Sequence, residues 1–139
     1  MNSIVRNSLA VLAGILLFVV GISGLHVLSS LLIEMPPFPE GEAATPEAWK
    51  AFMEGLSLVQ MLSALVSHIG GTFFGAWIAA LISRDGKLIV PLVVALFSMV
   101  GGVINVFMIP GQPLWFIVAD ISLYLPAGLL AGRLAQRNC

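Results

Sequence analysis

The chain has 139 residues, of which 59% are hydrophobic and 9% charged, and its formal net charge is −1. Soluble domains carry about 25% charged residues, so this composition, with a mean hydropathy of +1.05, excludes a globular protein surrounded by water. A net charge near zero argues against nucleic acid as a partner. The single cysteine, Cys139, excludes an intrachain disulfide and a cysteine-rich metal site. These properties predict an integral membrane protein whose main partner is the lipid bilayer.

Charged residues divide the chain into uncharged stretches that are long enough to cross a bilayer, which takes about 20 apolar residues. The first stretch exceeds the core of a signal peptide, about 7 to 15 residues, so we expect a retained helix. The expected fold is all-α: a single domain, residues 1–139, in which four transmembrane helices form an antiparallel bundle with a short external interfacial helix. The predicted spans cover about 9–33, 56–82, 88–109 and 113–132, and the external segment is 34–54.

The external segment contains a second type of helix signal. Thr45 is a predicted N-cap, and Pro46 suits the first helical position. From there Trp49, Phe52 and Met53 recur on one face, which predicts a helix lying in the outer membrane interface. A lid over an outward-facing cavity and a surface that docks a partner are the alternatives. Trp115, near the start of the fourth span, is assigned to the same interface.

The last two spans are separated by the sequence Pro110-Gly111-Gln112-Pro113. Proline followed by glycine at the centre of a turn favours type II geometry. Proline is also favoured at the first position of a helix. The sequence therefore predicts a tight turn here, with Pro113 opening the fourth span.

The basic residues predict the orientation of the bundle. Four spans place both termini on one side, and Lys50 is the one basic residue that falls on the other side. Because basic residues in short loops stay cytoplasmic, we expect a multi-pass protein of the bacterial inner membrane with both termini in the cytoplasm. The residues on the side of the termini are Arg6, Arg84, Lys87, Arg133 and Arg137.

Polar residues within the spans are the candidate functional site. Ionisable groups are costly in hydrocarbon and usually face the bundle interior or a cavity, and most of these lie in the outer half of their spans. We expect Asp120 to pair with a histidine or with Asn105, either as structural hydrogen bonding or as a proton or cation relay. The predicted intramembrane polar core consists of His26, Gln60, His68, Asn105, Asp120 and Tyr124.

Small residues at four-residue steps predict where helices approach closely. Gly71, Gly75 and Ala79 form such a row in the second span, and Gly128 and Gly132 end a row in the fourth. The fourth-span glycines are a candidate contact for a homodimer or for another membrane protein.

Stronger chemical hypotheses lack the residues they need. The two histidines form no HxxxH or ExxH pair, so no metal, haem or other cofactor is expected. The sequence Gly21-Ile22-Ser23-Gly24 resembles the GxSG of rhomboid proteases, but Ser23 lies inside the first span, whereas those enzymes need a six-helix core and a serine at a helix start. No catalytic residue is assigned.

Two stretches, GGTFFGAWIAALISRDGK and NVFMIPGQPLWFIVADISLYLPAGLLAGRLAQR, resemble a set of uncharacterised small bacterial four-helix membrane proteins. The resemblance covers residues 24 to 134, and MIPGQPLWF, residues 108 to 116, is its most specific part. It implies the topology and a bacterial origin, and no activity. The small multidrug transporters differ, since they carry a glutamate midway along the first helix.

The expected function is therefore, first, that of a non-enzymatic accessory or interaction protein with a buried polar core. A small oligomeric transporter or channel subunit that uses Asp120, Asn105 and His68 is the second hypothesis. A membrane-embedded enzyme is the third.

Overall fold

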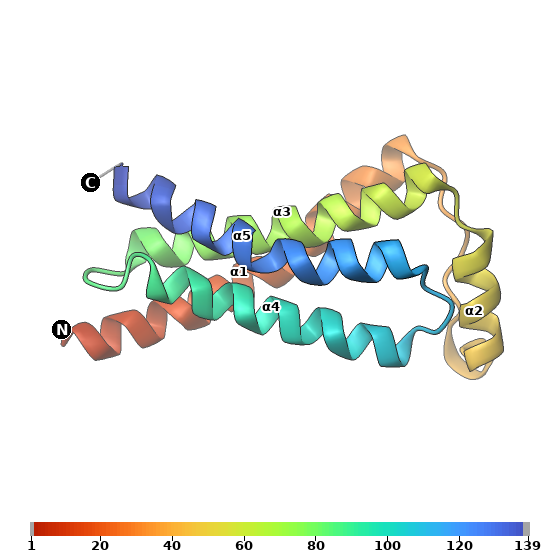
Figure 1. Ribbon diagram of the computed structural model, residues 1–139, viewed down its shortest axis with the longest axis horizontal. Helices are drawn as coiled ribbons and strands as arrows, with labels where there is room; N and C mark the ends of the chain where they lie inside the picture. Colours follow the sequence, from red (N-terminus) through yellow and green to blue (C-terminus); the bar gives the residue numbers. More distant parts are fainter. Residues whose placement is uncertain (1, 138–139) are drawn as a thin grey trace.

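The computed structural model describes residues 2–137, which contain α-helices, one short 3-10 helix at Gly41–Ala43, and no strand. Four helices are long and apolar enough to cross a membrane, and α2 is a short helix between the first two of them (Figure 1). Within residues 2–137, the prediction of an all-helical chain with four helices apolar enough to span a membrane is confirmed. The helices are α1 (Ser3–Leu32), α2 (Pro46–Gly55), α3 (Leu58–Ile82), α4 (Ile89–Met108) and α5 (Leu114–Arg137).

The four long helices lie side by side along the long axis of the molecule (Figure 1). Both ends of the described chain, together with the α3–α4 turn, lie at one end of the bundle, and α2 lies across the other. Helix α3 packs against α1, α4 and α5. Helix α1 is the most peripheral, because few of its side chains are buried and most of its large apolar residues face outward.

Helix α1 begins about two turns earlier than predicted. The Asn2 side chain caps it by accepting a hydrogen bond from the Ile4 amide. Arg6, taken from sequence as the limit of the span, lies inside the helix, and its Nε donates to the Ile82 carbonyl at 2.6 Å. A carbonyl at the end of α3, which has no partner in its own helix, is thereby satisfied. Helix α5 likewise continues to Arg137, past its apolar part.

Glycines bring α1 and α3 into contact. A Cβ atom added at Gly75 would lie against the Gly14 carbonyl oxygen and 2.8 Å from the Phe18 amide nitrogen. One Cβ added at Gly71 would lie 2.7 Å from the amide nitrogen of Ile22. These obstacles are backbone atoms, so the helices can approach this closely only where side chains are absent.

The glycines of α5 make the corresponding contact with α4. A Cβ atom at Gly128 would lie 2.5 Å from the Ala95 side chain, and one at Gly132 would lie 2.7 Å from the Lys87 carbonyl oxygen. Both glycines are buried. The helix packing predicted for Gly128 and Gly132 is therefore found between α5 and α4, within the bundle.

The turn chemistry agrees with the sequence. Thr45 caps α2 by accepting from the Ala48 amide, and Pro46 is its first residue, as predicted. Gly111 has φ +89°, the left-handed conformation that the third position of a type II turn requires. Its backbone packs against Lys50 of α2, where a Cβ would lie 2.9 Å from the Lys50 Cα. The α4–α5 turn therefore holds α2 against the end of the bundle.

Candidate functional site

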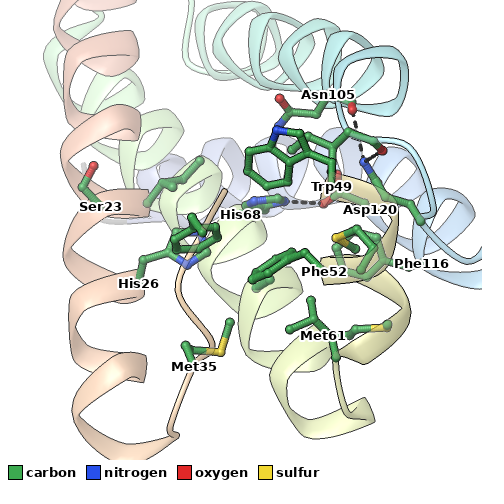
Figure 2. A pocket seen from close by; sticks show the side chains of 17 residues that line it. Ser23, His26, Met35, Trp49, Phe52, Met61, His68, Asn105, Phe116 and Asp120 are labelled. Carbon is green, nitrogen blue, oxygen red and sulfur yellow. Dashed lines mark hydrogen bonds and ion pairs between the residues drawn. The ribbon is translucent and has the colours of Figure 1, made fainter. Parts of the chain in front are cut away.

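A cavity of about 390 Å³ lies at the α2 end of the bundle, between the ends of the long helices and the covering segment (Figure 2). Most of its wall consists of aliphatic and aromatic side chains, and its polar residues come from all four long helices. The lining residues are Ile22, Ser23, His26, Met35, Phe38, Trp49, Phe52, Met53, Leu56, Met61, Ala64, His68, Asn105, Ile109, Gln112, Phe116 and Asp120.

Asp120 and His68 form a hydrogen-bonded pair in the wall of this cavity. The His68 Nδ1 atom lies 2.9 Å from one carboxylate oxygen of Asp120, and the Tyr124 hydroxyl donates to the other at 3.0 Å. Asp120 and Tyr124 are buried, one turn apart on α5, and His68 comes from α3. The predicted pairing of Asp120 with a histidine is found, and its partner is His68.

Gly102 of α4 makes room for this arrangement. A Cβ atom there would lie 2.7 Å from the Tyr124 ring and 3.2 Å from an Asp120 carboxylate oxygen. The α4 backbone therefore closes over Asp120 and Tyr124 from the side opposite to His68. This contact depends on the rotation of α4 against α5, which the spacing of residues along one helix does not determine.

The second histidine extends the pair across the cavity. The ring centroids of His26 and His68 are 5.7 Å apart with nearly perpendicular planes. Figure 2 shows His26 extending from α1 toward His68, which in turn lies beside Asp120. Three helices thus contribute a carboxylate and two imidazoles that lie next to one another in space. Their order is Asp120 on α5, His68 on α3 and His26 on α1.

Asn105 lines the cavity but is not the hydrogen-bond partner of Asp120. Its backbone carbonyl accepts from the Gln112 side chain at 3.1 Å, and the Ile109 carbonyl accepts from the same nitrogen at 3.1 Å. The Asn105 carbonyl also accepts from the Ile109 amide at 2.8 Å, so Gln112 adds a second donor there and supplies one to the Ile109 carbonyl at the end of α4.

Gln60 does not belong to the polar core that the sequence predicted. It forms a capping box with Ser57 at the start of α3, in which each side chain bonds the other residue's amide. Its side-chain nitrogen also donates to the Glu34 carbonyl at 2.7 Å. The Ser57-x-x-Gln60 spacing is a known helix-start signal, and the sequence interpretation missed it because it considered only depth in the span.

The apolar face of α2 is turned toward the cavity. Trp49, Phe52 and Met53 all line it, and Met53 is buried. The rings of Phe38 and Phe52 are 5.2 Å apart, and those of Trp49 and Phe52 are 5.7 Å apart. This arrangement corresponds to the alternative of a lid, and the placement of α2 in the membrane interface stays a prediction. The stripe was identified correctly, but its direction depends on what α2 packs against.

Trp115 lies outside the cavity and is 42% exposed, with its ring against Phe116. Ser23 is exposed at the cavity edge on α1. Among residues 2–137, no hydrogen bond joins Ser23 to either histidine.

The electrostatics of the pair define what it offers to a ligand. Where the carboxylate is ionised it can only accept hydrogen bonds, and the contact then requires a proton on His68 Nδ1, which leaves Nε2 of a neutral ring as an acceptor. A carboxylate that orients a histidine in this way also occurs behind metal ligands. Within the described part of the chain, however, no group of three or more His, Cys, Asp or Glu residues is arranged to hold a metal ion.

The opposite half of the bundle is closely packed. Ala10, Ala76, Ala79, Val94 and Ala131 have no exposed surface and form one cluster between the helices. The cavity described above therefore ends near His68 and Asp120. Comparison of the chain with protein-family models, curated proteins and solved structures gives no match.

Proposed function

We propose that the chain is a non-enzymatic binding protein of the bacterial inner membrane that receives a small, largely apolar molecule in the cavity beneath α2. The cavity is the observation that carries the proposal. Its volume of about 390 Å³ falls within the range of about 300 to 1,000 Å³ that small-molecule sites occupy. Apolar walls with a few convergent polar groups are typical of such sites.

The proposed topology is an antiparallel four-helix bundle with both termini in the cytoplasm and α2 on the external side. The charge distribution supports it. Arg6, Arg84 and Lys87 lie at the end of the termini, whereas the five glutamates of the chain lie between α1 and α3. The cavity then opens outward at the level of the outer membrane interface, where Trp115 would also lie.

The packed inner half supports binding over conduction. A channel through the bundle needs a continuous polar path, and the buried cluster around Val94 and Ala76 is apolar. The position of α2 supports the role of a lid, because its apolar residues line the cavity and the α4–α5 turn packs against it at Gly111.

The binding test uses a neutral fluorescent probe, N-phenyl-1-naphthylamine, with the full chain in phosphatidylcholine nanodiscs. We expect saturable fluorescence enhancement above that of protein-free nanodiscs. Ala64→Trp, which adds an indole to the cavity wall, should abolish the saturable component. Val66→Trp is the matched control, because Val66 lies on the same helix, is 62% exposed and does not line the cavity. Equal binding by both variants, or none by the parent, would contradict the proposal.

Topology is tested separately with a cysteine-free background, Cys139→Ser. A single cysteine introduced at Glu42 should react with a membrane-impermeant maleimide in intact cells, and one at Asp85 should react only after lysis. The reverse pattern would overturn the proposed orientation and place the cavity on the cytoplasmic side.

A transporter subunit is the second candidate, and the His68–Asp120 pair favours it. An ionisable pair within the membrane-spanning region, where the cavity meets the packed half, is suited to coupling a proton to a conformational change. Transport predicts proton-dependent efflux of the same probe from liposomes, lost in Asp120→Asn. A binding protein predicts no flux in either form.

A further inference from the structure

The cavity contains a carboxylate but no fixed positive charge. Asp120 lines it, while no lysine or arginine is among its lining residues. Lys50 of α2 is exposed, and its Nζ atom lies 3.8 Å from the Glu54 Oε1 atom. The groups packed around the Asp120 carboxylate are His68, Tyr124 and the α4 backbone at Gly102, so with a neutral imidazole the site keeps one negative charge.

Aromatic rings surround the space on the lid side. Phe38, Trp49 and Phe52 form a mutual cluster, and Phe116 of α5 is buried in a cluster with Met61. Figure 2 shows Trp49, Phe52 and Phe116 around the region next to the His68–Asp120 pair. The faces of aromatic rings carry partial negative charge and attract cations, with Trp the strongest.

The end of the molecule that contains the cavity is negatively charged, as is an ionised Asp120. The segment that covers the cavity carries all five glutamates of the chain, and each is exposed. One lysine offsets them. A region with charge of one sign raises the local concentration of ions of the opposite sign and lowers that of like-charged ions. An anionic ligand would be repelled both at the entrance and at Asp120.

We infer that the ligand of the cavity is a lipophilic organic cation, an amine or quaternary ammonium on an aromatic or aliphatic body. The inference rests on the proposed binding function. The cationic group lies between the Asp120–His68 pair and the rings of Trp49 and Phe52, and the apolar body occupies the remaining space. Burial of a cation requires such compensation, because an unpaired charge is expensive outside water.

The experiment compares two compounds of the same shape. Benzyltrimethylammonium carries a positive nitrogen where neopentylbenzene has a neutral carbon. Each is titrated against bound N-phenyl-1-naphthylamine in phosphatidylcholine nanodiscs at pH 8, where free imidazole is neutral, with correction for partitioning into protein-free nanodiscs. We expect the cation to bind at least about tenfold more tightly than its neutral isostere.

Two variants locate the preference. Asp120→Asn should weaken only the cation and lower its preference over the isostere to about fivefold, the part that the Trp49 ring can supply. Trp49→Leu should weaken the cation by about fivefold, as loss of one cation–π contact predicts. Trp115→Leu is its control, since Trp115 is outside the cavity. Trp49 lies on the lid, so this comparison remains informative where Asp120→Asn fails to fold.

The outcomes separate the two proposals. Probe binding without a preference for the cation, or a preference that is undiminished in both Asp120→Asn and Trp49→Leu, overturns the inference and leaves the binding function standing. Tighter binding of the anion phenylacetate would overturn it as well. Absence of saturable probe binding in the parent chain removes the binding function itself.

Discussion

The close approach of α1 and α3 can be tested with one methyl group. Gly75→Ala places a Cβ against the Gly14 carbonyl oxygen and 2.8 Å from both the Phe18 amide nitrogen and its Cβ. Carbon atoms pack comfortably at about 3.5 to 4.0 Å. Because two of these obstacles are backbone atoms, a rotamer change cannot relieve the overlap, and α1 must move away from α3 by roughly 1 Å.

Overpacking of this kind costs about 1 to 3 kcal/mol. Gly24→Ala is the matched control, because Gly24 is on α1 and a Cβ there meets nothing within 4 Å. It reports the intrinsic gain of alanine over glycine in a helix, up to about 1 kcal/mol. Both variants share this gain, so the difference between Gly75→Ala and Gly24→Ala in the free energy of unfolding should be the overpacking cost, about 1 to 3 kcal/mol.

The measurement is equilibrium unfolding by SDS in dodecylmaltoside micelles, followed by far-UV circular dichroism of the full chain. Movement of α1 also carries His26 away from His68, so probe binding in the cavity should weaken in Gly75→Ala and not in Gly24→Ala. Equal stabilities of the two variants would refute the contact between the helix backbones at Gly75.

Three further changes test the site and the start of α3. Tyr124→Phe removes the hydroxyl that donates to Asp120 and should lower the free energy of unfolding by about 1 kcal/mol. Hydrogen bonds within membranes average ~0.6 and reach ~1.7 kcal/mol. An unchanged SDS midpoint would show that this bond contributes nothing. Gly102→Ala displaces the Tyr124 ring and should destabilise the protein by about 1 to 3 kcal/mol in the same titration. Gly101→Ala is the control, because a Cβ there meets nothing within 4 Å. Equal effects of the two changes would contradict the placement of Gly102. Ser57→Ala removes the N-cap of α3 and should lower the free energy of unfolding by about 1 kcal/mol. Amide hydrogen exchange at the first turn of α3 measures the effect directly. Unchanged protection there would argue against the capping box.

Local signals made part of this protein predictable. The lengths of the uncharged stretches predicted four spans, and Thr45 with Pro46 predicted the start of α2. Pro110 and Gly111 predicted the turn, which the positive φ of Gly111 confirms. Each of these depends on a few neighbouring residues, because hydrogen bonding and backbone sterics act over one helical turn.

Such local signals did not determine the rotation of each helix about its axis or the helix against which each face packs. Gln60 has the spacing of a polar-core residue, yet it caps α3, because its side chain reaches Ser57 and Glu34 more readily than a helix interface. The glycines Gly128 and Gly132 have the spacing of a free packing surface, yet α4 already fills it. A period of four residues identifies a helix face without naming the helix that covers it.

The sequence by itself determined the apolar character of the chain, the number of its predicted spans and the polar residues that should face away from lipid. These follow from composition and from the cost of placing polar groups in hydrocarbon. Only the tertiary structure decided that Asp120 pairs with His68, that His26 faces His68, and that α2 turns its aromatic side chains over the cavity. Those features depend on the rotation and crossing of helices far apart in sequence, which close packing between their small residues sets.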